Sequence, residues 1–351
     1  MKKVFALLLA LCMVFALCAC GSSAAPAASA PAADKPADAA AAPADAPADA
    51  PAAVSANLTM GTGGEAGTYY AVGGVLGSYI GQKTDISVNV VASNGSAANL
   101  VGIVNDKIYD LATVQSDVMT YAFNGTNSFA EVGVLDGFRV LGGLYAETVQ
   151  IVSVDPSIQS VTDLAGKNVC VGDVGSGTYF NTVDILAAYG MTLDDIVPKY
   201  ESFNSSTESL RDGKIDAAFT TAGAPTPSIV DLATTNAVNL ISIDDDHMAK
   251  LLDACPWYAA YTIPAGTYKG QDADAVTVTV KATLVCRADL PDDVAYAIVS
   301  TIFDNTADIA ALHAKGAELS LDFATDGIAV PFAAGAAKYF AEKGITVATA
   351  P

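Results

Sequence analysis

The sequence is poor in the residues that most catalytic sites require. It contains only two histidines, His247 and His313, and neither belongs to a motif with a nucleophile. No serine-nucleophile elbow, zinc-protease motif or phosphate-loop lysine occurs in it. We therefore expect no catalytic residue and no cofactor. A secreted enzyme stays open only as the less favoured alternative.

Positive charge is equally scarce. Lys and Arg number 17 against 38 Asp and Glu, which gives a formal net charge of −21. No basic stripe exists, so we do not expect nucleic acid as a partner. The three arginines, Arg139, Arg211 and Arg287, fall outside the loops discussed below. An anionic ligand would therefore have to be held by local hydrogen-bond donors against the field of the whole chain.

Cysteines are few beyond the N-terminal segment, and they are Cys170, Cys255 and Cys286. The first and last fall in apolar, strand-like runs, where buried and unreactive thiols are typical. Three cysteines cannot all pair within one chain, and a single disulfide stays open. No spacing indicates a metal site. The run Asp-Asp-Asp-His at 244–247 is more typical of a solvated acidic turn before a helix.

The N-terminal segment has the pattern of a secretion signal. Lysines precede an apolar run at residues 4–17, which is too short to span a bilayer. The sequence Leu-Cys-Ala-Cys-Gly resembles a bacterial lipobox, which makes residues 1–20 a lipoprotein signal and Cys20 the lipidated residue. Residues 21–56, rich in Ala and Pro, are expected to form a disordered tether. We expect the folded part to lie outside the cytoplasm, anchored to the membrane by this lipid.

A glycine-rich loop follows the first expected strand. Residues 58–60 have the pattern of a strand, Gly-Thr-Gly-Gly at 61–64 breaks it, and an apolar stripe at helical spacing begins near Ala66. Such a loop offers unpaired N–H groups and the positive end of a helix dipole, which together bind anions. Tyr69, at the start of this helix, is expected to pack on the ligand. A tight turn without a ligand is the alternative.

A second loop of the same build, Gly-Ser-Gly-Thr, lies at 175–178. It follows a short apolar strand at 169–171 and opens a helix. The alternation of strands and helices indicates an α/β protein with largely parallel strands, whose ligands bind beyond the carboxyl ends of those strands. If the two loops face one another, a carboxylate could be held between two helix amino termini.

The length of the folded region indicates two lobes. Strand patterns near 145–154 and 276–285 predict two crossings between them. We assign residues 57–148 and 272–351 to lobe 1, and residues 149–271 to lobe 2. Two crossings form a hinge, and a hinge would let an interlobe cleft close on a ligand.

A series of motifs follows in one order along the folded region. They are GTGGEAGTYYAVGGVL, ASNGSAANL, ATVQSDV, VGSGTYFNTVDILAAYG, LRDGKIDAAFTTAGAPTPSIVDLA, IPAGTYKGQDADAVTVTV and VPFAAGAAKYFAEKGI. In these motifs the chain resembles the TAXI class of substrate-binding subunits of TRAP transporters. The resemblance implies a type II periplasmic-binding-protein fold, with two α/β lobes joined by a two-strand hinge, and no enzyme activity. It also implies capture of a small carboxylate, such as glutamate or a dicarboxylate, and delivery to an ion-gradient-driven permease.

The loops and the resemblance together give the expected ligand-binding residues. They are Gly61, Thr62, Gly63, Tyr69, Ser93, Asn94, Ser96, Gln115, Ser116, Gly175, Ser176, Gly177, Thr178, Thr221, Gly223 and Thr226. Family members often carry His-Pro before the last helix, where this chain has Ala333 and Ala334, so the family's docking surface does not transfer. A ligand-sensing lipoprotein that docks on a membrane receptor is the rival interpretation. We expect a monomer.

Overall fold

The computed structural model describes residues 54–350. The expected signal, the lipidation site Cys20 and the tether up to residue 53 lie outside the described residues. The first strand begins at Ser55, slightly before the boundary suggested by composition, because Ser55 already pairs with Asp85. Within the described part, no helix is both long and apolar enough to cross a membrane.

A ten-stranded sheet runs through this part of the chain, in the order β2-β1-β3-β10-β4-β7-β5-β6, with β8 beside β4 and β9 beside β10. Its strands are β1 Ser55–Gly61, β2 Asp85–Val91, β3 Leu111–Gln115, β4 Phe138–Ser153, β5 Asn168–Cys170, β6 Val197–Lys199, β7 Ala217–Ala222, β8 Asn239–Leu240, β9 Ala259–Ile263 and β10 Ala275–Arg287. The pairs β1–β2, β1–β3, β5–β6 and β5–β7 are parallel. Every pair that involves β4 or β10 is antiparallel.

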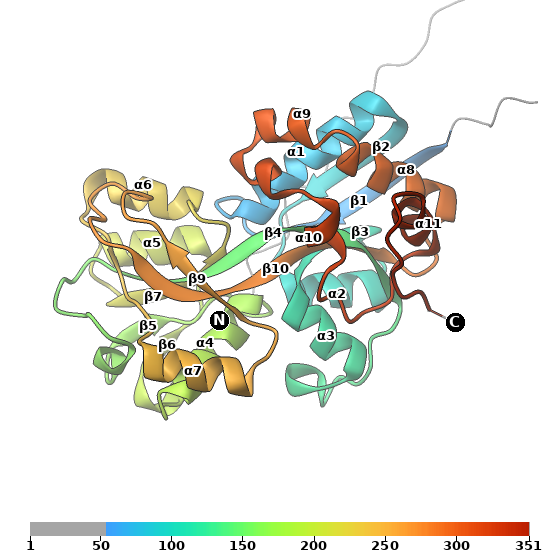
Figure 1. Cartoon of the computed structure of the whole chain (residues 1–351). Helices are drawn as coiled ribbons and strands as arrows, with labels where there is room; N and C mark the ends of the chain where they lie inside the picture. The colour runs from blue at the N-terminus through green and yellow to red at the C-terminus, as the bar shows by residue number, and fades with distance from the viewer. Residues whose placement is uncertain (1–53, 351) are drawn as a thin grey trace, which may run out of the picture. The chain divides into compact units, whose positions relative to one another are not determined.

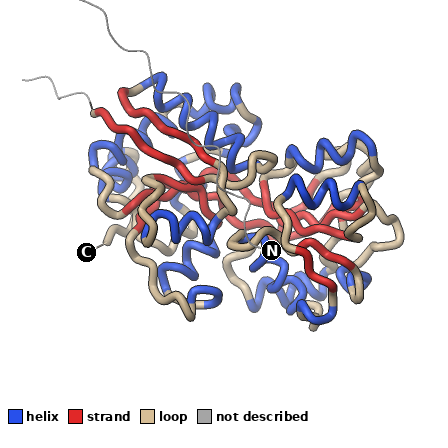
Figure 2. Tube along the Cα trace, turned by 180° about the vertical axis from the view of Figure 1, so that it is seen from behind, coloured by secondary structure: helices blue, strands red, loops and turns tan. Residues whose placement is uncertain are grey.

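Helices lie on both sides of the strands (Figure 2). They are α1 Thr68–Lys83, α2 Ser96–Val104, α3 Ser116–Asn124, α4 Gly177–Ala188, α5 Phe203–Arg211, α6 Pro227–Thr235, α7 Asp245–Ala254, α8 Asp292–Phe303, α9 Thr306–Leu312, α10 Leu321–Thr325 and α11 Ala334–Glu342. Short 3-10 helices are η1 Asn127–Phe129, η2 Val161–Leu164, η3 Leu193–Asp195 and η4 Ala314–Glu318. The predicted α/β class is confirmed, and both glycine-rich loops open helices, α1 and α4. The expectation of largely parallel strands was wrong, because β4 and β10 pair antiparallel with their neighbours.

The two longest strands, β4 and β10, join two groups of helices (Figure 1). Buried side chains form separate clusters on the two groups. One cluster draws its members from residues 58–145 and 282–340, and two others draw theirs from residues 149–280. We call the part around the first cluster the first half and the part around the others the second half. Both long strands therefore pass from one core to the other.

Two minor expectations from the sequence have clear outcomes. Cys170, Cys255 and Cys286 are all free and buried, so the disulfide that the sequence left open is not formed. Asp244 is the N-cap of α7, and its Oδ1 accepts a hydrogen bond from the backbone N–H of His247 (3.1 Å). The acidic run at 244–247 is therefore the N-cap and first turn of the predicted helix, which begins at Asp245, earlier than the sequence indicated.

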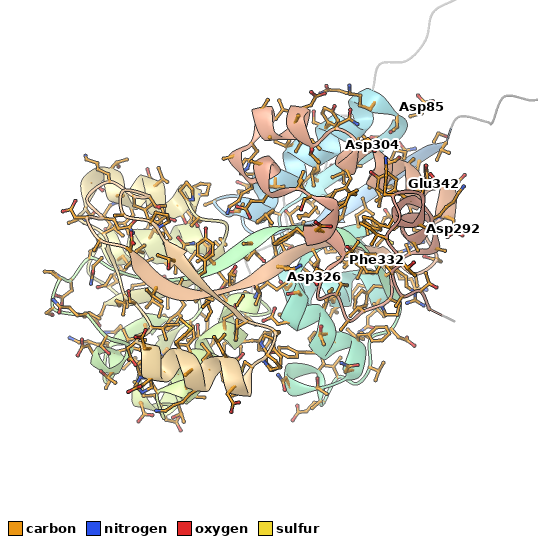
Figure 3. All side chains as sticks on the ribbon, viewed as in Figure 1. Asp85, Asp292, Asp304, Asp326, Phe332 and Glu342 are labelled. Atoms are coloured by element: carbon orange, nitrogen blue, oxygen red, sulfur yellow. The ribbon has the colours of Figure 1, made fainter. Side chains whose placement is uncertain are left out.

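Acidic side chains gather on the outer surface of the first half. Asp292, Asp304 and Glu342 are exposed around α8 and α11, and Asp85 is exposed at the start of the edge strand β2 (Figure 3). Solvent there has high dielectric, so the charges are hydrated and screened. Part of the large negative charge is therefore placed away from the junction of the two halves.

The contact between α8 and α11 gives a test of the packing. A Cβ atom at Gly335 would lie 1.9 Å from the backbone oxygen of Asp292, whereas a Cβ at Gly74 in α1 would meet nothing within 4 Å. We expect Gly335→Ala to lower the free energy of unfolding by about 1–3 kcal/mol, because backbone must move. Gly74→Ala should instead raise it by roughly 0.5–1 kcal/mol through helix propensity. Urea denaturation of both variants measures the difference, and equal effects would contradict the packing.

Candidate functional site

A cavity of about 60 Å³ lies where the two halves meet. Its walls come from the ends of strands and the beginnings of helices in both halves. The lining residues are Gly63, Gly64, Gly67, Thr68, Tyr69, Ser93, Asn94, Gly95, Ser96, Gln115, Glu147, Asp173, Ser176, Gly177, Thr178, Ser202, Phe203, Thr221 and Ala222.

Four helices, α1, α2, α4 and α5, begin at this cavity, and each contributes its N-cap or first residues to the wall. The first amides of a helix have no acceptor within the helix. For the amides of Thr68 and Tyr69 in α1, and of Gly177 and Thr178 in α4, the described residues supply no other acceptor. Their N–H groups and the two helix dipoles thus make the local potential favourable for an anion.

The amino terminus of α2 has a different role, since its donors are taken by the other half. The backbone amides of Ala97 and Ala98 both donate to the carbonyl oxygen of Gly175, at 3.1 and 3.3 Å. The hydroxyl of Thr68 likewise donates across the junction to the carbonyl oxygen of Gly223 (3.1 Å). These bonds hold the two halves in a closed arrangement around the cavity.

The mouth of the cavity is narrowed by an aromatic contact. Phe203, the first residue of α5, comes so close to Gly67 that a Cβ there would lie 3.4 Å from its ring. Gly67 is the N-cap of α1 in the first half, and Phe203 belongs to the second half. The ring therefore covers the start of α1 from the opposite side, and the cavity stays partly open to solvent.

A polar network lies behind the cavity and also joins the halves. Gln115 Nε2 donates to Asn181 Oδ1 (2.8 Å), and Asn181 Nδ2 donates to Asp117 Oδ2 (2.9 Å) and to the hydroxyl oxygen of Tyr258 (2.6 Å). The Tyr258 hydroxyl donates in turn to Asp184 Oδ2 (3.0 Å). Gln115 fits because position 177 is glycine, where a Cβ would lie 1.8 Å from Gln115 Oε1.

Both carboxyl groups of this network are affected by burial. Burial raises the pKa of Asp117 to about 7, and hydrogen bonds from the Val118 amide and Asn181 act in the opposite direction. Burial raises the pKa of Asp184 to about 6, against the hydrogen bond from Tyr258. The network that joins the halves is therefore sensitive to pH near neutrality.

Two carboxyl residues that sequence reasoning missed line the cavity, Asp173 after β5 and Glu147 on β4. Glu147 on β4 is 2% exposed, and its Oε2 accepts a short hydrogen bond from the hydroxyl of Tyr69. Burial raises the pKa of Glu147 well above its usual range, while Tyr69 and Lys315 act in the opposite direction. No local pattern marks Glu147, because it lies inside a long strand and its partner, Tyr69 in α1, is 78 positions away in the sequence.

Thr221 is a buried polar residue of the wall whose hydroxyl lacks a partner among the described residues. Its side chain is buried at the end of β7, and its hydroxyl oxygen makes no hydrogen bond with the described residues. An unpaired buried hydroxyl costs free energy, and a ligand that bonds to it would recover that cost. The group thus points to a polar ligand.

Ten of the expected ligand-binding residues line the cavity. They are Gly63, Tyr69, Ser93, Asn94, Ser96, Gln115, Ser176, Gly177, Thr178 and Thr221. They come from both halves, as the comparison of the two glycine-rich loops predicted.

Six expected residues do not line it, namely Gly61, Thr62, Ser116, Gly175, Gly223 and Thr226. The hydroxyl of Thr62 is buried beneath the wall and donates to the carbonyl oxygen of Val91 (2.7 Å). Ser116 accepts from the Lys281 amide (3.1 Å), and the Thr226 hydroxyl donates to Gly223 (3.1 Å).

The three glycines among these six residues have structural roles. A Cβ at Gly61 would meet the Tyr109 ring at 2.7 Å. Gly175 and Gly223 accept hydrogen bonds from the opposite half. All six positions therefore shape or close the site without forming its wall.

A family model described as the NMT1-like family matches residues 60–344 of this chain. Among solved structures, a protein from Bordetella bronchiseptica is similar at 16% identity over 81% of this chain and 88% of the other, with a TM-score of 0.49. A putative L-cystine ABC transporter protein from Listeria monocytogenes shows 16% identity over 76% and 98%, with a TM-score of 0.48. The alkanesulfonate-binding protein SsuA from Xanthomonas axonopodis pv. citri shows 16% over 83% and 92%, with a TM-score of 0.46.

The buried Asp117 predicts how stability depends on pH. Its pKa is about 7 in the folded state against an ordinary value of 3.8, so the folded state binds the proton more tightly than the unfolded state. Stability is therefore greatest at low pH and is lost as pH rises through about 7. Between pH 5 and pH 8 we expect the free energy of unfolding to fall by about 2–3 kcal/mol on this account.

Asp117→Asn tests the assignment, because Asn keeps the shape and does not titrate. Urea denaturation at pH 5 and pH 8 should show a smaller decline for this variant than for the wild type. The exposed Asp292→Asn serves as control and should leave the decline unchanged. If Asp117→Asn declines as steeply as the wild type, the buried carboxyl is not the titrating group.

Proposed function

The chain belongs to the NMT1-like family, and from that premise we propose that it is a solute-binding protein that captures a small organic anion between its two halves. The observation that carries the proposal is the closed cavity itself. It brings the amino termini of α1 and α4 from opposite halves to the same small space, with the unpaired Thr221 hydroxyl in the wall. These groups are hydrogen-bond donors, which is what an anion requires.

Capture would proceed by closure of two lobes about β4 and β10. We propose lobe 1 as residues 57–148 and 272–351, and lobe 2 as residues 149–271. In β4 the buried clusters change over between Tyr145 and Val149, at the first boundary, whereas in β10 they change over between Val280 and Ala282, later in the chain than the second boundary. With the lobes apart, the cavity would be open to solvent. With them together, the bonds from Thr68 to Gly223 and from the α2 amides to Gly175 would form.

The ligand we propose is a carboxylate, such as glutamate or another dicarboxylate, and the partner a TRAP-type permease driven by an ion gradient. The support is the resemblance of the sequence motifs to the TAXI class, together with the donor-rich wall. We further propose that the protein acts outside the cytoplasm, as a monomer held at the membrane by lipid on Cys20. A sensing lipoprotein that docks on a receptor is the second candidate, since it would use the same cavity.

A catalytic role finds no support at the cavity. Neither histidine lines it. His247 faces Asp244 at the start of α7, with its Nδ1 2.8 Å from Asp244 Oδ1, and the His313 Nδ1 accepts from the Lys315 amide (3.1 Å). Both rings therefore have structural partners in the described part of the chain.

A thermal-shift screen of the purified protein tests the proposal directly. Amino acids, dicarboxylates and oxoacids should include compounds that raise the melting temperature, because a ligand that binds only the folded state stabilises it. Neutral sugars and organic cations serve as controls and should have no effect. If only sugars or cations raise the melting temperature, the proposed anion is excluded.

Thr221→Val tests whether the cavity is the place of binding. The variant keeps the volume and removes the unpaired hydroxyl, so the affinity for the active carboxylate should fall by about 1–3 kcal/mol in calorimetry. Thr148→Val is the matched control, because the Thr148 hydroxyl is also buried without a partner but does not line the cavity. Equal affinities of the wild type and Thr221→Val would place the ligand elsewhere.

A further inference from the structure

Glu147 occupies the point at which the two halves are joined. It lies on β4, pairs with Val280 of β10, and falls between the members of the two cores on its strand, Tyr145 and Val149. Its Oε2 is bound by the Tyr69 hydroxyl, whereas its Oε1 makes no hydrogen bond with the described residues. Since Glu147 lines the cavity, this free oxygen is available to a ligand.

The charged and titratable groups around Glu147 do not neutralise it. They are Tyr69 on α1, Tyr145 on β4 itself, Asp117 on α3 and Lys315 on η4. The only cation among them, Lys315, is already paired with Glu318, at 2.5 Å from Nζ to Oε1. Asp117 adds negative charge when it ionises, and burial raises the pKa of Glu147. The closed cavity therefore favours the neutral acid.

An anionic ligand strengthens the preference of Glu147 for its neutral form. The lining residues include no Lys, Arg or His, so the backbone amides at the starts of α1 and α4 are the main positively polarised groups of the site. An ionised Glu147 beside the ligand would add a further negative charge to a cavity that Asp173 also lines. Like charges at such distances disfavour the ionised forms. A neutral Glu147 instead has an O–H group, which can donate to the ligand oxygen.

On the basis of the proposed capture of an anion, we propose that Glu147 binds the ligand as the neutral acid, so that closure on each anion takes up one proton from solution. In the open arrangement the carboxylate is hydrated and holds no proton at neutral pH. On closure the proton passes from water or buffer to Glu147, and the acid O–H donates to the bound anion. The site would therefore favour oxoacids and dicarboxylates that lack an ammonium group, since an ammonium group needs an ionised carboxylate. Glutamate is then the least favoured of the carboxylates proposed above.

Proton uptake can be measured on the wild-type full-length protein without any variant. Isothermal titration at pH 7 in two buffers of different ionisation enthalpy gives the number of protons bound per ligand. The probes are pyruvate, succinate and L-glutamate, and the one that gives the largest thermal shift at pH 6 is titrated. Because Asp117 is also buried on closure, we expect at least one proton per ligand, and an affinity that weakens at least tenfold from pH 6 to pH 7. Uptake of no proton overturns the proposal.

Glu147→Gln identifies the group that takes the proton. Gln has a similar shape and donates from its amide without titrating, so the variant should bind the same probe at pH 6 within about tenfold of the wild type. Between pH 6 and pH 7 its affinity should change about tenfold less than that of the wild type, because Asp117 is then the main group that still titrates on closure. Glu342→Gln, an exposed change of the same kind on α11, should keep the pH dependence of the wild type.

Other outcomes are equally decisive. If Glu147→Gln melts like the wild type but no longer binds at pH 6, Glu147 acts as a charged acceptor and the proposal fails. It also fails if L-glutamate binds most tightly and without proton uptake. In both cases anion capture itself survives. If none of the three probes shifts the melting temperature, the proposed anion and this inference fall together.

Discussion

The pairing of β4 with β10 is the interaction on which the rest of the structure depends. These antiparallel strands connect two sets of parallel strands, one in each half, and their residues belong to both cores. Parallel strands carry helices that begin at their carboxyl ends. Because the long strands join the sets side by side, the starts of α1 and α4 come to one cavity. A change in the twist of the β4–β10 pair would move both walls of the cavity at the same time.

The electrostatics of the cavity oppose those of the whole protein. A chain with a net charge of −21 repels anions at long range. Screening limits that repulsion to roughly 8 Å at physiological ionic strength. Acids such as Asp292 and Asp304 lie exposed around α8 and α11, whereas the helix amino termini point into the cavity. Short-range dipoles can therefore dominate inside, where the surrounding protein lowers the effective dielectric constant.

Local pattern was enough to find the loops, because their signals are confined to a few neighbouring residues. Glycine at 61, 63, 175 and 177 and the apolar stripes that follow predicted where α1 and α4 begin. The direction of side chains was harder to predict. Thr62 was expected to face a ligand, yet its hydroxyl bonds Val91, a partner that only the register of β1 with β2 reveals.

Glu147 was beyond sequence reasoning for the same reason. Within β4 a single Glu between Ala146 and Thr148 is typical of a strand with one solvated face, and the contact with Tyr69 spans 78 positions. The antiparallel role of β4 and β10 was also missed, since the order of strands in a sheet leaves no local trace. The part of the site that composition and spacing did not predict is therefore set by contacts between residues far apart in the sequence.

The free energy of closing the two halves is the small difference between opposing contributions. The bonds from Thr68, from the α2 amides and from Gln115 each contribute about 0.5–1.5 kcal/mol, because they replace bonds to water. Against them stands the burial of Asp117 and Glu147, whose raised pKa values show that the ionised forms are disfavoured inside. A difference of a few kcal/mol is what a ligand can supply through its differential affinity for the closed form. Because the opposing term is ionisation, the proton and the ligand act on the same equilibrium.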